Sequence, residues 1–249
     1  MKLALLTCAI YPTMDEARAA LWIFLTSALK AGFAQEDIHL YGIGREFHRA
    51  DWRTKKLIYQ LDYLLAMPKD YTHILYSDGA DGLIVGSVAE IIDRYKAMGS
   101  PDIVCSAYRS IANPFHEFNE PGLYVGCFDE SAPKPYLHVG GYLAKREIII
   151  DAFTRMLTLP RQTYDDCWNW MDAWKEGWFR PVIDSRDQLF CVPDFDAAIN
   201  KNWLEVVAAG RVWSGNHTPN VIHLTGGHVE REGWKDYKLE PLARELGLI

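Results

Sequence analysis

The chain has 249 residues, of which 49% are hydrophobic and 24% charged. This is enough apolar material for one α/β domain with a well-filled core. The formal net charge of −7 argues against a wide basic face of the kind that binds duplex nucleic acid. No apolar stretch reaches the ~20 residues that span a bilayer. The five cysteines include no C-x-x-C pair, so we expect reduced thiols and a cytoplasmic location.

Strand and helix patterns alternate along the first 108 residues. Residues 3–10 form an apolar run typical of a buried strand; no small-x-small cleavage site follows it, which argues against a signal peptide. Thr13 and Glu16 predict a capping box for a helix that ends at Gly32. Further strands are expected at 38–42, 73–76 and 103–107, with helices over 57–65 and from Ser87 onward. This alternation predicts a mostly parallel, doubly wound sheet.

Two carboxylates follow the predicted strand at 73–76, in Ser77-Asp78-Gly79-Ala80-Asp81-Gly82. Ligands of open α/β sheets bind outside the carboxyl ends of the strands. Two acids three residues apart around a tight glycine turn can share one divalent cation. An Asp-rich turn with a helix cap explains the same residues equally well, so Asp78 and Asp81 are candidate metal ligands only.

A second candidate segment is Val221-Ile222-His223-Leu224-Thr225-Gly226-Gly227, in which a predicted strand ends in a histidine. An imidazole can complete a cation site made by two carboxylates, and such a mixed set suits Mn²⁺ somewhat better than Mg²⁺. Gly226 and Gly227 would let backbone N–H groups approach a phosphate. The alternative is a structural histidine at a strand end.

Two more segments carry weaker signals. Gly140 and Gly141 interrupt an apolar strand pattern, which indicates either a bulge or a close approach of backbone to ligand. Asp187 either caps a helix or reaches a pocket, where it would hydrogen-bond a hydroxyl or act as a base. The sequence contains no G-x-x-x-x-G-K-[ST] phosphate loop and no complete dinucleotide fingerprint.

Taken in order, these motifs resemble the GT-A glycosyltransferases, most closely the glycosyltransferase domain of procollagen lysyl hydroxylases and related procollagen glycosyltransferases. The motifs are a strand ending in Asp78-Gly79-Ala80-Asp81, Leu137-His138-Val139-Gly140-Gly141-Tyr142, Asp187-Gln188-Leu189-Phe190 and His223-Leu224-Thr225-Gly226. The resemblance covers nearly the whole chain. It implies a single GT-A domain over 1–249, with a mostly parallel central sheet flanked by helices. Residues 1–110 would form the nucleotide-sugar-binding half and 111–249 the acceptor-side half.

The resemblance also implies roles for individual residues. Asp78, Asp81 and His223 would hold Mn²⁺, or Mg²⁺, on the diphosphate of a nucleotide sugar, which we expect to be UDP-linked. Asp187 and Gln188 would face the sugar or the acceptor, with Asp187 our first choice as a base. The residues expected to contact the donor are Thr7, Trp52, Lys55, Lys56, Gly140, Gly141, Gly226 and Gly227.

The chain departs from the family pattern at several positions. His138-Val139 replaces Asn-Ser, Arg186 replaces an aspartate, and Val229 stands where relatives carry a phosphate-binding lysine. The residues that could supply the missing charge are Lys55, Lys56, His228, Arg231 and Lys235.

We therefore expect a metal-dependent glycosyltransferase that moves a sugar to a hydroxyl of a carbohydrate, a protein or a modified DNA base. A bacterial or viral enzyme without a membrane span fits the sequence. Two alternatives remain at this stage. One is a nucleotidyltransferase on a similar sheet, which would release pyrophosphate. The other is a non-catalytic module that binds a glycan or a partner.

Overall fold

The structure is a computed structural model that describes residues 1–45, 52–108, 131–132, 134, 136–159, 166–192, 219–224 and 239–249. Within these ranges, the side chains of 52–54, 108 and 166–168 are not described. Among the described helices, none is both long and apolar enough to cross a membrane.

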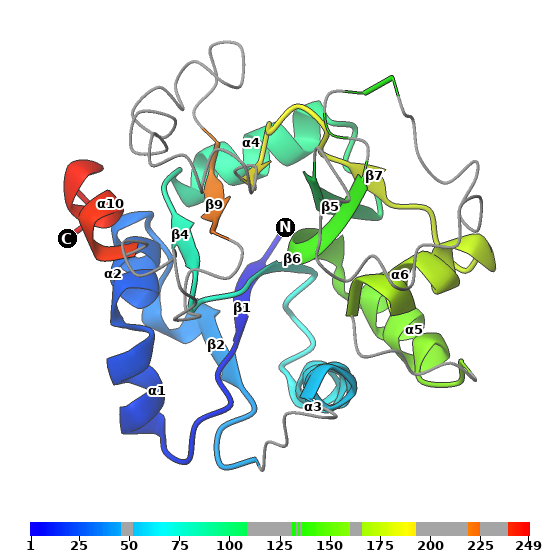
Figure 1. The fold of residues 1–249 in the computed structure, drawn as a ribbon, viewed down its shortest axis with the longest axis horizontal. Coiled ribbons are helices and arrows are strands. Elements are labelled where there is room, and N and C mark those ends of the chain that lie inside the picture. The colour runs from blue at the N-terminus through cyan, green and yellow to red at the C-terminus, as the bar shows by residue number, and fades with distance from the viewer. Residues whose placement is uncertain are drawn as a thin grey trace, which may run out of the picture.

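A six-stranded sheet with the spatial order β2-β1-β3-β6-β5-β7 forms the centre of the molecule (Figure 1). Its strands are β1 (Leu3–Cys8), β2 (Ile38–Tyr41), β3 (His73–Ser77), β5 (Ile103–Tyr108), β6 (Tyr136–Lys145) and β7 (Val182–Ile183). β1 pairs in parallel with β2 and β3, and β7 pairs in parallel with β5. β6 runs antiparallel to both of its neighbours, β3 and β5.

The predicted α/β fold class is confirmed, but the sheet is mixed rather than nearly all parallel. The difference lies in β6, which separates β3 from β5. Hydrophobic patterning identifies a buried strand without specifying its direction, because the side chains alternate across the sheet in either case.

A second, three-stranded sheet lies beside the first, in the order β4-β9-β8. Its strands are β4 (Gly82–Ile84), β8 (Phe190–Cys191) and β9 (Val221–His223). β9 is antiparallel to β4 and parallel to β8. The helical elements are α1 (Met14–Ala20), α2 (Trp22–Lys30), η1 (Gln35–Asp37), α3 (Trp52–Ala66), α4 (Val88–Ala97), α5 (Arg146–Met156), α6 (Asp166–Lys175) and α10 (Leu239–Glu245).

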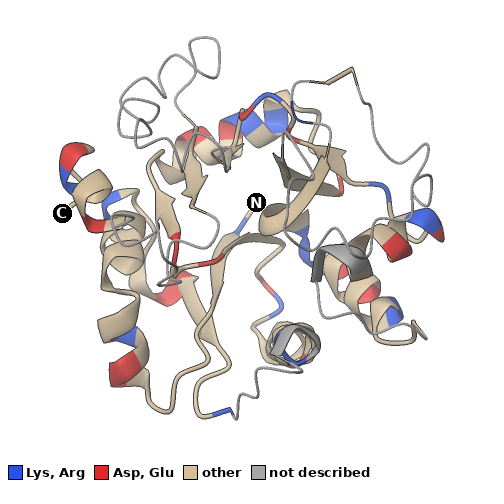
Figure 2. Cartoon of the chain, viewed as in Figure 1, with Lys and Arg blue, Asp and Glu red and all other residues tan. Residues whose placement is uncertain are grey.

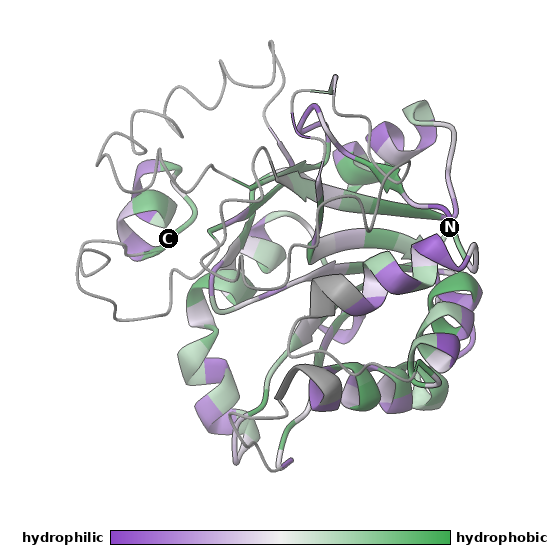
Figure 3. Ribbon diagram, turned by 45° about the vertical axis from the view of Figure 1, so that its right-hand side comes forward, coloured by the Kyte–Doolittle hydropathy of each residue, from purple (hydrophilic) through white to green (hydrophobic). Residues whose placement is uncertain are grey.

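Successive side chains of the central strands point to opposite faces of the sheet and pack into two separate hydrophobic cores. Ala4, Leu6 and Tyr76 face a core built with α3, α5 and α6. Leu5 and Leu75, one position away, face a second core that includes residues of α2 and α4. Helices therefore cover both faces of the sheet, as Figure 1 shows. In Figure 3 the central strands are mostly hydrophobic, whereas the helices alternate between hydrophobic and hydrophilic residues along their length.

Most of the local predictions are confirmed. Thr13 caps α1 by accepting a hydrogen bond from the backbone N–H of Glu16, and Ser87 forms a complete capping box with Glu90 at the start of α4. Gly32 follows α2 with a φ of +92°, a conformation that glycine adopts at little cost. The single helix expected from the Thr13 cap to Gly32 is instead two helices, α1 and α2, that meet at Leu21.

The predicted irregularity at the glycine pair is also present. The pairing of β5 with β6 shifts between Cys105, opposite Tyr142, and Ser106, opposite His138. Gly140 and Gly141 lie within this register shift, as expected for a bulge. Charged residues lie mainly on the helices and loops around the sheet, and the strands themselves carry few (Figure 2).

The proposed division of the chain at residue 110 does not separate two sheets. β6 and β7, from the later half, pair with β3 and β5 from the earlier half. The assignment of the two halves to donor and acceptor stays a prediction.

Candidate active site

The carboxyl end of β3 positions both aspartates of the candidate metal site. β3 lies between β1 and β6, and its last four residues are buried. Asp78 follows directly, with its backbone N–H donating to the carbonyl of Gly140 on β6 at 2.9 Å. The chain then turns tightly into β4. A methyl group on Gly82 would lie 2.4 Å from the Asp78 carbonyl oxygen, so the turn requires glycine at that position.

Strand pairing brings His223 to the two aspartates. In the antiparallel ladder between β4 and β9, Gly82 lies opposite His223. The backbone N–H of Leu224 donates to the Asp81 carbonyl at 2.7 Å, which extends the pairing by one bond. The imidazole is thereby fixed beside a carboxylate 142 positions earlier in the chain.

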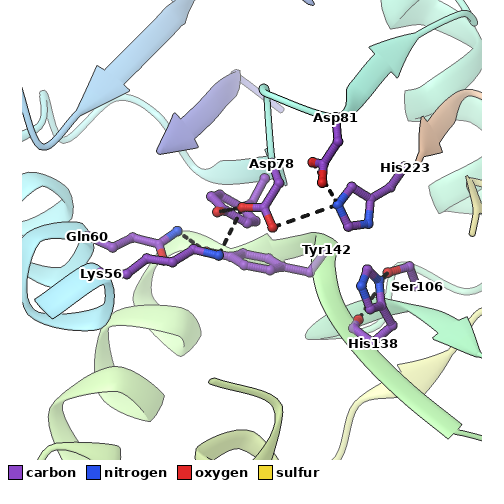
Figure 4. A network of polar contacts seen from close by, with 9 residues as sticks. Lys56, Gln60, Asp78, Asp81, Ser106, His138, Tyr142 and His223 are labelled. Carbon is purple, nitrogen blue, oxygen red and sulfur yellow. Dashed lines mark hydrogen bonds and ion pairs between the residues drawn. The ribbon is translucent and has the colours of Figure 1, made fainter. Parts of the chain in front are cut away.

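The three side chains form one cluster. His223 Nε2 lies 3.0 Å from Oδ1 of Asp81 and 3.8 Å from Oδ2 of Asp78 (Figure 4). One ligand atom from each residue lies within 4.8 Å of the others. The side chains of Asp81 and His223 are 5% exposed, and that of Asp78 is 27% exposed, so the cluster opens on the Asp78 side. Two carboxylate oxygens and one imidazole nitrogen form a donor set that suits a divalent cation such as Mn²⁺.

The charge around His223 favours its protonated form. Burial lowers the pKa of this imidazole, but the charge and hydrogen bond of Asp81 and the charge of Asp78 outweigh burial, and the pKa is raised above its ordinary value. Lys56 opposes this effect weakly. The cluster therefore attracts positive charge, which a proton or a metal cation can supply.

Asp78 is held from the opposite side by two donors. Lys56, on α3, donates from Nζ to Oδ1 at 2.9 Å, and the hydroxyl of Tyr76 donates to the same oxygen. Lys56 has a side chain only 7% exposed, and its Nζ lies 5.3 Å from the centre of the Tyr76 ring. Both donors act on Oδ1, so Oδ2 is directed toward His223.

Each glycine of the predicted pair makes room for a neighbouring side chain. A methyl group on Gly140 would lie 2.4 Å from Cε1 of His223 and 2.5 Å from Cε1 of His138. A methyl group on Gly141 would lie 2.9 Å from Cδ1 of Phe190, on β8. Their predicted contact with a donor sugar stays a prediction.

Asp187 lies in a turn that precedes β8, so the alternative that it caps a helix is wrong. Its φ is +53°, in the left-handed region, and its side chain is buried against Lys134. Lys134 Nζ contacts Oδ1 at 2.9 Å and Oδ2 at 2.7 Å, and it also donates to the Val192 carbonyl at 2.9 Å. The ammonium group of Lys134 therefore engages both oxygens of the carboxylate. The catalytic role of Asp187 stays a prediction.

Gln188 belongs to the same turn, which a buried carboxylate organises. Asp184 accepts hydrogen bonds from the backbone N–H groups of Gln188, Leu189 and Phe190 at 2.8, 2.7 and 2.8 Å. The guanidinium of Arg94 donates to the Gln188 carbonyl at 2.6 Å. These bonds involve the backbone of Gln188, and the role of its side chain stays a prediction.

The structure describes only some of the remaining residues that were predicted to contact the sugar donor or to replace the missing positive charge. Thr7 is fully buried in β1, and its Oγ1 has no hydrogen-bond partner among the described residues. Lys55 is partly exposed on α3, next to Lys56. Trp52 begins α3, but its side chain lies outside the description, as do Gly226, Gly227, His228, Arg231 and Lys235.

Sequence reasoning missed several residues that organise this region. Lys134 and Asp184 belong to no recognisable motif. A single lysine or aspartate in a sequence is expected to be exposed to solvent, so their burial could not be predicted. Tyr76 reads as an ordinary strand residue in the sequence. His138 was noted only as a departure from the family pattern, although its ring stacks on that of His223 with centroids 4.7 Å apart.

No protein-family model matches the sequence, and no curated protein matches it. Among solved structures, the chain is similar to a glycosyltransferase involved in the glycosylation of the major capsid of PBCV-1. The identity is 12% and the TM-score 0.51, over 97% of this chain and 99% of that one. It is also similar to apo mouse xyloside xylosyltransferase 1, with 14% identity and a TM-score of 0.52, over 92% of this chain and 99% of that one. At these identities the likeness concerns the fold, and it supports the expected GT-A class. The closer resemblance to procollagen lysyl hydroxylases stays a prediction.

Proposed function

We propose that this chain is a metal-dependent glycosyltransferase that moves a sugar from a nucleotide sugar, UDP-linked, to an acceptor hydroxyl. One observation carries the proposal: Asp78, Asp81 and His223 converge at the carboxyl end of a central strand. They do so on a fold shared with two glycosyltransferase structures. In α/β sheets this edge is where ligands bind.

The cation is proposed from the chemistry of the donor set. Two carboxylates and an imidazole offer hard oxygen and borderline nitrogen ligands together, which favours Mn²⁺ over Mg²⁺. When bound, a divalent cation supplies Lewis-acid stabilisation to the departing diphosphate. Asp78 would contribute Oδ2, because Lys56 and Tyr76 hold its other oxygen.

Lys56 adds a second positive charge to the proposed site. Its ammonium group is buried and lies against Asp78, so its position is fixed before any ligand arrives. A pre-positioned charge costs no reorganisation when negative charge develops on a leaving group. We assign Lys56 to the diphosphate of the donor for this reason.

The acceptor would present a hydroxyl on a carbohydrate, a protein or a modified DNA base. Asp187 and Gln188 remain our candidates for its side of the site. A base role for Asp187 would require the carboxylate to leave Lys134, since that ion pair engages both of its oxygens.

The test compares two Asp→Asn variants. Asp81→Asn keeps the shape of the buried side chain and removes its charge, while Asp102→Asn changes an exposed carboxylate that pairs with Lys145 at 2.7 Å. Thermal stabilisation by UDP-sugars with Mn²⁺ is measured first, because a ligand raises apparent stability by mass action. Release of UDP is then measured with the sugar that stabilises best.

We expect Mn²⁺-dependent stabilisation and UDP release in the wild type and in Asp102→Asn, and neither in Asp81→Asn. Full activity of Asp81→Asn in EDTA would refute the metal role. Release of pyrophosphate instead of UDP would identify a nucleotidyltransferase. Absence of binding by every nucleotide tested, with or without Mn²⁺, would favour a non-catalytic module.

A further inference from the structure

Among the described residues, His223 lacks the contact that usually orients a metal-binding histidine. Such a histidine normally donates its second ring N–H to a carboxylate, a carbonyl or water, which fixes the ring. Here Nδ1 of His223 is buried and has no hydrogen-bond partner among the described residues. The χ2 torsion of histidine has a broad energy profile, so a ring without such a bond needs packing to hold its orientation.

The neighbouring ring of His138 supplies that packing. The two imidazoles stack with centroids 4.7 Å apart and an interplanar angle of 26° (Figure 4). Both residues are 4% exposed, so the stack lies in the interior of the protein. Gly140 lies against the Cε1 edges of both rings, where a methyl group would come within 2.5 Å of each. Rotation of the His223 ring is therefore blocked on one face by His138 and on one edge by the backbone.

His138 is itself fixed by Ser106. The Ser106 hydroxyl lies 2.8 Å from Nδ1 of His138 and 3.0 Å from the carbonyl oxygen of the same residue. Both contacts are hydrogen bonds at once when the hydroxyl donates to the carbonyl and Nδ1–H donates to the hydroxyl oxygen. Ser106 thus holds the backbone and the ring of His138 together, across the register shift between β5 and β6.

We propose that His138 is a positioning residue for the metal ligand His223, and that stacking on a ring held by Ser106 replaces a hydrogen bond at Nδ1, which no described residue supplies. The inference rests on the proposed function in one respect, namely that His223 binds the cation. It assigns no metal contact to His138.

The test measures Mn²⁺ affinity by calorimetry, without nucleotide, in the full chain, in Asp81→Asn and in three further variants. His138→Ala removes the stack, Ser106→Ala removes the restraint on His138, and His138→Phe keeps a ring while removing its nitrogens. Loss of an outer partner of a metal ligand typically costs 10–100-fold in affinity, so we expect at least about a 10-fold loss in His138→Ala. Ser106→Ala should lose less. His138→Phe keeps the stacked ring but loses its bond to Ser106, so it should lose no more affinity than Ser106→Ala.

Melting temperatures without metal show whether each variant is folded. Ser106→Ala removes one oxygen atom, and it keeps the test decisive if His138→Ala does not fold. A merely structural role would lower the melting temperature and leave the affinity of the folded protein unchanged. In that case His138→Phe and folded His138→Ala would bind Mn²⁺ with the same affinity.

The outcomes separate this inference from the proposed function. If the wild type does not bind Mn²⁺, or if Asp81→Asn binds it equally well, the proposed function fails. If that binding is present but Ser106→Ala and folded His138→Ala match the wild type, only the positioning role is overturned. The positioning role is also overturned if His138→Phe loses as much affinity as His138→Ala.

Discussion

Replacing Gly140 with alanine offers a direct test of how the site is packed. The added methyl group would lie 2.4 Å from Cε1 of His223 and 2.5 Å from Cε1 of His138. Carbon atoms in good contact are about 3.5 Å apart, so the rings or the strand must shift by about 1 Å. Metal–ligand distances tolerate only about 0.2 Å, and a shift of this size therefore removes His223 from the coordination geometry.

The expected consequences of Gly140→Ala concern both stability and binding. Overpacking of a well-filled interior costs about 1–3 kcal/mol. For a chain of this length, that corresponds to a melting temperature lower by roughly 2–12 °C. Mn²⁺ affinity, measured by calorimetry on the folded protein, should fall by at least about 10-fold, as for loss of an outer partner.

Gly141→Ala serves as the matched control for this experiment. Its methyl group would meet Phe190 Cδ1 at 2.9 Å, so it also strains the packing. Its three nearest contacts include no histidine atom, and it meets the Ser106 hydroxyl only at 3.4 Å, an ordinary van der Waals distance. We expect a lower melting temperature with nearly unchanged Mn²⁺ affinity. If Gly140→Ala bound Mn²⁺ as tightly as Gly141→Ala, the packing argument for the site would be wrong.

Three further predictions concern the surroundings of the site. Tyr76→Phe removes a hydrogen-bond donor to Asp78 and should weaken Mn²⁺ binding by about 10-fold in calorimetry. The control Tyr142→Phe should bind Mn²⁺ like the wild type. Equal affinities of the two variants would contradict the role of the Tyr76 hydroxyl. The raised pKa of His223 means that Mn²⁺ must displace a proton, so affinity should fall as pH drops through that pKa, by about 10-fold per unit below it. A titration that is flat with pH would contradict the histidine as a ligand. Lys134→Met leaves the buried Asp187 carboxylate without its ammonium partner and should lower the free energy of unfolding by about 3–5 kcal/mol in urea denaturation. Adding Asp187→Asn should recover part of the loss, because asparagine tolerates the positive φ and carries no charge; no recovery would indicate that the ion pair is not the cause.

The sequence predicted the parts of the fold that depend on local pattern. Ser87 and Glu90 mark the start of α4 because a capping box needs only residues three apart. Buried strands were located by their apolar runs. The direction of β6 was not predictable, since it depends on how distant strands pair and not on the residues within the strand.

The site, like the fold, was predictable only where it depends on residues close together in the sequence. Asp78 and Asp81 could be placed at a sheet edge because they directly follow a strand. Their meeting with His223 was inferred from chemistry and family resemblance, and the pairing of β4 with β9 provides the physical cause. The buried ion pair of Lys134 and Asp187 joins residues 53 positions apart, and no local sequence pattern predicts such a contact.

The pairing of β4 with β9 has a consequence for how the molecule holds together. The residues it brings into contact, Asp81 and His223, are separated by 142 positions. A cation bound by both would act as a cross-link that closes most of the chain into a loop, and closing long loops removes much of the disorder of the unfolded state. Chelation would then also destabilise the folded protein, because it would remove a link between the turn that precedes β4 and the end of β9.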